Sequence, residues 1–235
     1  MSSTSDDHAT RPRIHLSTTE TLTGYDRWAA RYEEHPNPLV AATGHLLARA
    51  PEAWAGHDVV ELGCGTGRNA RAVLDADARR YTGVDGSAGM LAQARARIAD
   101  PRATWCLADL HQALPLPEAC CDRVLVVLVL EHIAALPPLC AEIARLLRPG
   151  GALHLLEIHP DLLGAGRNAH FDDGGTEVRF TSHVHPVAAI EQALAAAGLT
   201  VATARSVTAD ELAPIVPRLA RHAGRNVVLD LTATR

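Results

Sequence analysis

Residues 59–70, VVELGCGTGRNA, constrain the fold more than any other part of the chain. An apolar run leads into three glycines at alternate positions, Gly63, Gly65 and Gly67, and a helix-like segment follows. A strand that turns through glycines into a helix brings backbone N–H groups close to a ligand. The stretch therefore predicts the first strand, turn and helix of a nucleotide-binding α/β domain.

Apolar, strand-like runs alternate with helical segments from Asp58 to Ile158. This alternation predicts a parallel sheet with helices on both faces, that is, a doubly wound α/β fold. The run DRVLVVLVL at 122–130 is apolar at nearly every position, as expected of a central strand that is buried on both sides. The late segment RNVVLDLTATR predicts an antiparallel strand inserted at the sheet edge.

The segment ahead of the glycine turn predicts a helical lid. Residues 1–16 are polar and lack periodicity, so we expect a mobile tail there. Ser17 and Glu20 have the spacing of a capping box, and Tyr25, Trp28 and Tyr32 recur at helical intervals. We therefore assign 17–50 to the lid and 51–235 to the main domain.

Composition excludes several function classes. All 22 basic residues are arginine, so neither a P-loop lysine nor a Schiff-base lysine is present. The net charge of -5 gives no general attraction to nucleic acid. The five cysteines have no metal-site spacing, and no apolar stretch approaches the roughly 20 residues of a spanning helix. We expect a cytoplasmic protein with no membrane or nucleic-acid partner, as a monomer or a homodimer.

The glycine spacing argues against a nicotinamide dinucleotide. The dinucleotide pattern requires a third glycine where this chain has Arg68, and a large side chain there hinders pyrophosphate packing. Instead, carboxylates occur at three strand ends, at Glu61, Asp85 and Asp109. An acidic rim suits a cofactor with a cationic end, a ribose and an exocyclic amine. A glycine turn that only joins strand to helix is the alternative.

Five motifs together resemble those of class I S-adenosylmethionine-dependent methyltransferases: VVELGCGTGRNA, GVDGSAGMLAQARA, ADL, DRVLVVLVLEHI and IARLLRPGGALHLLEIHP. The resemblance covers about residues 20–200 and implies a Rossmann-like sheet of seven strands with the last one antiparallel. It also implies that the glycine turn contacts the methionyl part of the cofactor, that Asp85 binds the ribose, and that Met90 and Asp109 lie at the adenine. Plain helix packing is the alternative for Met90. The cofactor-binding residues expected are Tyr25, Glu61, Gly63, Cys64, Gly65, Gly67, Asp85, Gly86, Met90, Asp109, Leu110 and Leu128.

His132, in the sequence LEHI after the fourth strand, is the candidate base, because an imidazole titrates near neutral pH. A histidine that only pins the loop is the alternative. Tyr32 and His159 are the other candidate catalytic residues. The resemblance places the acceptor pocket in an insertion at about 159–185. The substrate-binding residues expected are Tyr32, Glu157, His159, His170, His183 and His185.

His183 and His185 lie two apart and would point to one side of an extended segment, where a metal is conceivable with His159 or His170. Separate hydrogen-bonding histidines explain the same residues, so we expect no metal.

The leading hypothesis is a methyltransferase that moves the methyl group of S-adenosylmethionine to a small molecule, as in secondary metabolism, and leaves S-adenosylhomocysteine. A peptide, protein or RNA acceptor is the first alternative. A relative that binds the cofactor without methylating is the second, and a nicotinamide oxidoreductase is the third.

Overall fold

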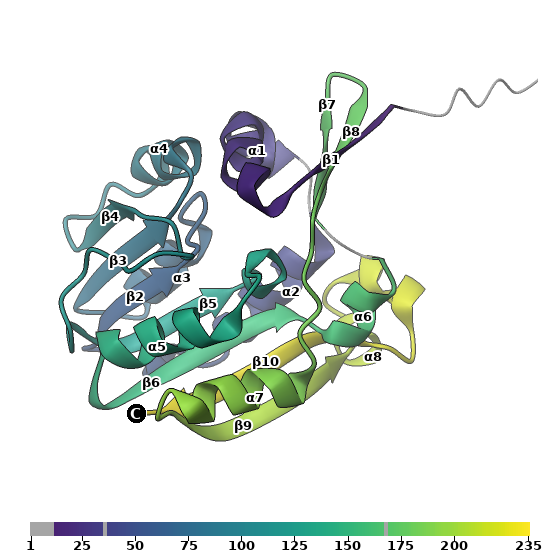
Figure 1. Ribbon diagram of the computed structural model, residues 1–235. Coiled ribbons are helices and arrows are strands. Elements are labelled where there is room, and N and C mark those ends of the chain that lie inside the picture. Colours follow the sequence, from purple (N-terminus) through teal and green to yellow (C-terminus); the bar gives the residue numbers. More distant parts are fainter. Residues whose placement is uncertain (1–11, 35–36, 167–168) are drawn as a thin grey trace, which may run out of the picture.

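The computed structural model describes residues 12–34, 37–166 and 169–235 (Figure 1). Its main body is one seven-stranded sheet in the order β4-β3-β2-β5-β6-β10-β9. Neighbours from β4 to β6 pair in parallel, and β10 is antiparallel to both β6 and β9. The strands are β2 (Asp58–Leu62), β3 (Arg80–Asp85), β4 (Ala103–Leu107), β5 (Cys121–Val127), β6 (Leu147–Ile158), β9 (Thr200–Thr208) and β10 (Asn226–Thr234).

This sheet confirms the predicted fold class, including the antiparallel last strand. One detail of the prediction was wrong. We expected residues 225–235 at the sheet edge, but β10 lies between β6 and β9, so that β9 is the edge strand. The interior position suits the apolar residues Val227, Val228 and Leu229, which are all buried.

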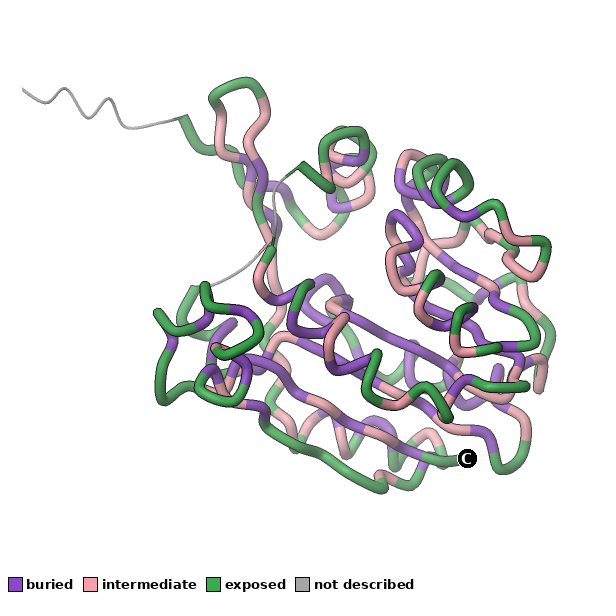
Figure 2. The backbone as a smooth tube through the Cα atoms, turned by 180° about the vertical axis from the view of Figure 1, so that it is seen from behind, coloured by how far each residue is buried: buried purple, intermediate pink, exposed green. Residues whose placement is uncertain are grey.

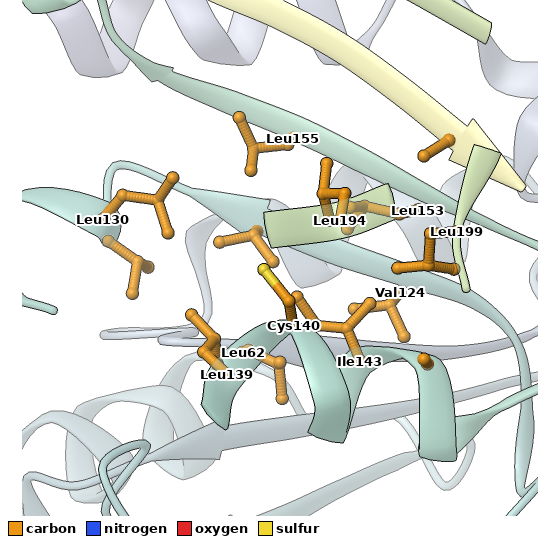
Figure 3. Close-up of a cluster of buried hydrophobic side chains, with 14 of the residues drawn as sticks. Leu62, Val124, Leu130, Leu139, Cys140, Ile143, Leu153, Leu155, Leu194 and Leu199 are labelled. Carbon is orange, nitrogen blue, oxygen red and sulfur yellow. The ribbon is translucent and has the colours of Figure 1, made fainter. Parts of the chain in front are cut away.

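Both faces of the sheet are covered by helices. Val124 and Val126 of β5 belong to the cluster that α5 (Leu136–Leu146) and α7 (Val187–Ala196) complete. Figure 3 shows Val124 in this cluster. Leu125, between them, faces the opposite cluster, because successive side chains of a strand alternate. That cluster includes side chains from α2 (Pro38–Leu47), α3 (Arg68–Asp75) and α8 (Ala209–Leu212). The remaining body helices are η3 (Pro51–Ala53), α4 (Ala88–Arg97), η4 (Leu130–His132), α6 (Pro160–Gly164) and η5 (Pro217–His222).

A smaller unit, which we call the cap, stands beside the strand ends of the body (Figure 1). It joins two distant parts of the chain in a three-stranded sheet of order β1-β8-β7. Figure 2 shows its hairpin tip exposed, whereas buried residues follow the central strands of the body. The cap consists of β1 (Arg13–Leu16), η1 (Thr18–Glu20), α1 (Thr21–Trp28), η2 (Ala29–Glu34), β7 (His170–Asp173) and β8 (Thr176–Phe180).

The domain boundaries differ from the expected ones at two places. We assigned residues up to 16 to a tail, but 13–16 form β1, because Leu16 packs against Phe171 and Phe180; residues 1–11 lie outside the described residues. We assigned residues up to 50 to the lid, but α2 packs in the body core through Leu46 and Leu47. The lid helices are therefore confined to α1 and its flanking 3-10 turns. Within the described ranges, no helix has the length and apolar character needed to cross a membrane.

Candidate functional site

A cavity of about 410 Å³ opens where β2, β3 and β5 end, between the body and the cap. Of the residues that the sequence assigned to the cofactor, ten line it: Tyr25, Gly63, Cys64, Gly65, Asp85, Gly86, Met90, Asp109, Leu110 and Leu128. Glu61 and Gly67 do not. Tyr32 and His132 line it as well, so candidate cofactor and catalytic residues share one space.

The glycine turn has the backbone that its sequence requires. Gly63 has a φ of +73°, and a Cβ there would lie 2.4 Å from Val129 Cγ2. Gly67 has a φ of +71° as the N-cap of α3, and a Cβ on it would lie 2.8 Å from the Trp105 ring. Glycine is needed at both positions, because each combines a positive φ with no room for a Cβ; of the two, Gly63 also lines the cavity.

Asp85 lies at the end of β3 with its carboxylate tied to the turn beside it. One oxygen accepts the Gly65 N–H at 2.8 Å and the other accepts the Ser87 N–H at 2.8 Å. Burial raises the pKa of this carboxyl, although both backbone bonds lower it. Each oxygen keeps a further lone pair for a ligand. Asp85 therefore shapes the glycine turn and can bind a ligand at the same time.

Glu61 lies beneath the turn and outside the cavity. Its carboxyl accepts the Asn69 Nδ2–H at 2.7 Å and the phenol of Tyr81. Burial raises its pKa to about 7. Because Asn69 itself lines the cavity, Glu61 acts on the site through that amide rather than by direct contact.

His132 lies at the end of η4 and forms a pair with Tyr25 of the cap, whose hydroxyl is 2.7 Å from Nε2. Burial lowers the pKa of His132 to about 3, so the ring is neutral at physiological pH. Its Nδ1 is buried without a hydrogen-bond partner in the described part of the chain. Tyr32, the other candidate catalytic residue at the cavity, packs against a different side chain: the Arg68 guanidinium lies over its ring, 5.8 Å from the ring centroid.

Glu157 lies outside the main cavity and holds the turn that carries His132. Leu128, directly after β5, has a φ of +56°, a strained backbone for a non-glycine residue. This bend directs the Val129 and Leu130 N–H groups to the Glu157 carboxyl, at 2.9 and 3.2 Å. We expected Glu157 at the substrate, but in the structure its carboxyl holds the backbone of the turn at Val129 and Leu130.

Glu157→Gln is expected to make stability less sensitive to alkaline pH. Burial raises the pKa of Glu157 from 4.5 to about 8. Its stabilising contribution is therefore complete below pH 4.5 and is lost as pH rises toward 8, by up to about 1.4 kcal/mol per pH unit. Urea unfolding of both proteins at pH 5.5 and 8.5 measures this difference.

In that experiment the wild type should lose more stability than Glu157→Gln between the two pH values. Exposed Glu118 provides the matched control, because Glu118→Gln should shift with pH as the wild type does. Parallel pH dependence of Glu157→Gln and the wild type would contradict the assignment.

The four other histidines expected at the acceptor do not reach the main cavity. His159 is the N-cap of α6: Nδ1 accepts the Asp161 N–H at 3.2 Å, so Nε2–H donates to Ser206 Oγ at 3.0 Å. His170 is exposed on β7. His183 Nε2 lies 3.1 Å from Thr18 Oγ1, and His185 Nε2 donates to the Ile133 carbonyl at 2.7 Å.

Local hydrogen bonds thus explain the placement of His159, His183 and His185. Histidines at this spacing occur both in metal sites and as separate hydrogen-bonding residues, so the sequence alone does not distinguish a metal site from local hydrogen bonds. Within the described ranges, no group of three His, Cys, Asp or Glu side chains is arranged to hold a metal ion.

Several lining residues were missed by the sequence analysis. They come from the start of the cap, from the turn after β4 and from the glycine turn: Thr18, Thr19, Thr21, Leu22, Thr66, Arg68, Asn69, His111 and Gln112. The nearest sequence signal was the strand end at Asp109, whose carboxylate lies 2.9 Å from His111 Nδ1. For the cap threonines there was no signal, because a polar helix start is usually solvated.

The comparisons with known proteins agree with this geometry. Residues 60–155 match the family model described as a methyltransferase domain. An uncharacterized methyltransferase from Emericella nidulans is 30% identical over 220 residues, which are 77% of this chain and 76% of that protein. Trans-aconitate 2-methyltransferase from Delftia acidovorans is 37% identical over 134 residues, 53% of this chain and 46% of that protein.

Among solved structures, the S-adenosylmethionine-dependent methyltransferase from Mesorhizobium loti superposes with a TM-score of 0.67 at 25% identity. The superposition covers 80% of this chain and 95% of that one. The chain spans less than half the length of several curated relatives that it matches. With the sheet order, the glycine turn and the acidic strand ends described above, these similarities show that the chain belongs to the class I S-adenosylmethionine-dependent methyltransferases.

Proposed function

We propose that this protein transfers the methyl group of S-adenosylmethionine to a small-molecule acceptor by in-line attack. One observation carries the proposal: a single cavity of about 410 Å³ joins the acidic strand ends Asp85 and Asp109 to the Tyr25–His132 pair. A cavity of this size lies in the range of sites for cofactors and other small ligands.

The residues present fit the cofactor. An added Cβ on Gly65 meets no atom within 4 Å, so the turn leaves open space beside its backbone. The Asp85 carboxylate can accept hydrogen bonds from ribose hydroxyls. Met90, Asp109 and Leu110 also line the cavity and would hold the adenine. These are the roles that the sequence resemblance implies.

The acceptor chemistry is assigned to His132. The bound cofactor supplies an electrophilic methyl group on a sulfonium ion, whose positive charge disappears when the methyl group leaves. A neutral His132 can accept a hydrogen bond at Nε2 from an acceptor hydroxyl or amine that takes the place of the Tyr25 hydroxyl, and so orient the acceptor's lone pair. Because burial lowers its pKa to about 3, the ring is a weak base, and it can take the acceptor's proton only as the sulfonium charge is lost, which leaves the net charge of the cavity unchanged. Tyr25 holds the imidazole from the cap side.

The wall of the cavity favours a small acceptor without a strong negative charge. Arg68 is its sole cationic side chain among the described residues, and it is already paired with Glu33 at 2.8 Å. Thr18, Thr21 and Gln112 offer uncharged polar groups. The cap covers the cavity, so the enclosed space suits a compact molecule better than a folded polymer. The name of the Delftia relative, a trans-aconitate methyltransferase, supports a small-molecule acceptor in general.

Calorimetry with S-adenosylhomocysteine, followed by an acceptor screen with methyl-labelled S-adenosylmethionine, tests the proposal. We expect micromolar or tighter binding and label transfer to a low-mass product. Failure to bind at micromolar concentration would reject the central claim. Binding without any labelled product would favour a non-methylating relative, and labelled RNA or protein with a matching mobility shift would favour a macromolecular acceptor.

A further inference from the structure

The cap is held together as one unit by aromatic packing. Tyr25 stacks on Phe180 with ring centroids 4.6 Å apart, and Trp28 stacks on Phe171 at 5.1 Å. Arg27 adds an ion pair to Asp173 on the hairpin. The N-terminal helix and the β7–β8 hairpin therefore share one small core, although they lie far apart in the sequence.

Asp26 connects this unit to the start of α4. Its Oδ1 accepts the Ser87 hydroxyl at 2.6 Å and the Gly89 N–H at 2.8 Å. Ser87 is the N-cap of α4, and its Oγ accepts the Met90 N–H at 3.1 Å. The Ser87 N–H binds the Asp85 carboxylate. Asp26 thus acts on the short segment that carries Asp85 and Met90.

Glu33 connects the cap to the glycine turn. It accepts the Thr66 hydroxyl at 2.5 Å and forms ion pairs with Arg68 at 2.8 Å and Arg97 at 3.2 Å. Thr66 is buried within the turn itself, and Arg68 begins α3. Arg68, the residue that departs from the dinucleotide pattern, is therefore a contact between the cap and the turn.

We propose that Asp26 and Glu33 are positioning residues that couple closure of the cap to the two loops that hold the cofactor. Each carboxylate contacts one loop from the cap side, so a loop shaped by the cofactor favours the closed cap, and a closed cap keeps the loop in its binding shape. The inference rests on the proposed function in that S-adenosylmethionine is the ligand of these loops. Because a lid and a ligand that favour the same state stabilise each other, loss of either carboxylate lowers apparent affinity.

The test compares Asp26→Ala and Glu33→Ala with Asp75→Ala. Asp75 also forms an ion pair, with Arg71 at 3.9 Å, but both side chains are exposed and neither lines the cavity. The probe is S-adenosylhomocysteine, with affinity from calorimetry and dissociation from stopped-flow displacement. We expect each cap variant to release the probe at least about tenfold faster, because each carboxylate makes two or more contacts and loss of a single charge-assisted hydrogen bond would already give this factor, and Asp75→Ala to match the wild type.

Hydrogen exchange without any ligand gives a second readout. In Glu33→Ala, amides of 21–34 should exchange faster, whereas those of β2 and β5 should keep their protection, which shows that the body remains folded. Glu33→Gln keeps an oxygen that can accept the Thr66 hydroxyl but loses both ion pairs, so its release rate should fall between those of Glu33→Ala and the wild type.

The outcomes separate the two proposals. If the wild type does not bind the probe, the proposed function fails and the coupling fails with it. If the wild type binds and both cap variants release the probe at the wild-type rate, the coupling alone is refuted. Faster release by both variants, with unchanged protection in the body strands, supports it.

Discussion

Asp85→Ala is expected to weaken binding of S-adenosylhomocysteine about a hundredfold, because two charge-assisted hydrogen bonds of roughly 1.5 kcal/mol each would be lost. The carboxylate lines the cavity and accepts backbone N–H groups from both the glycine turn and the turn before α4. Its removal therefore takes away the ribose partner and leaves the Gly65 N–H without its acceptor. Isothermal titration calorimetry measures the change directly.

Two further variants show whether the loss of affinity comes from the Asp85 carboxylate itself. Asp85→Asn keeps an acceptor oxygen at the same place and should lose about tenfold, as expected for one charge-assisted bond. Asp100→Ala removes a carboxylate whose partner, Arg102 at 2.9 Å, lies away from the cavity, and it should bind as the wild type does. Binding by Asp85→Ala within threefold of the wild type would be incompatible with a ribose contact.

His132→Ala is expected to lower the rate of methyl transfer about a hundredfold, the lower range for loss of a positioned acid or base. Cofactor affinity should change less than threefold, because the loops around Asp85 do not depend on the imidazole. Single-turnover transfer from methyl-labelled cofactor to an acceptor from the screen gives the rate. Tyr25→Phe keeps the ring stack on Phe180 and removes only the hydroxyl at Nε2, so its loss should be smaller.

The pH dependence sharpens this second prediction. Since burial lowers the pKa of His132 to about 3, the ring stays neutral in the folded protein throughout the range from pH 5.5 to 8.5. The ratio of wild-type to His132→Ala rates should therefore be constant across that range. A ratio that falls at the acidic end with a midpoint near 6.5 would show that His132 titrates as an exposed imidazole does.

The body of the fold could be predicted from sequence because its signals are local. The central strands of the parallel sheet are apolar runs, and β2, β3, β5 and β6 are each followed by a turn and a helix. The cap could not be predicted in the same way. β1 pairs with β8 in parallel, Arg13 opposite Glu177, and no local periodicity indicates a partner so far along the chain. The polar surroundings of Arg13 made the segment look like a tail.

In the candidate site, too, some residues could be placed from the sequence and others could not. Asp85 and Asp109 end strands, and the edge where parallel strands end is shared, so their convergence followed from topology. Glu157 and His159 also lie at a strand end, but backbone N–H groups and Ser206 take up their polar atoms. Sequence identifies a side chain that could serve a site, whereas the nearest hydrogen-bond partner decides whether it does.

The pairing of β1 with β8 has a consequence for how the protein is made. The first cap strand leaves the ribosome long before its partner, which is separated from it by most of the body. Contacts of such large sequence separation form late, because the intervening chain must first be ordered. The sheet and its glycine turn can therefore fold first, and the cover over the cavity is completed only after residue 180 has emerged. During synthesis the unpaired β1 edge and the aromatic side chains of α1 are exposed, which is the stage at which aggregation or chaperone binding should be concentrated.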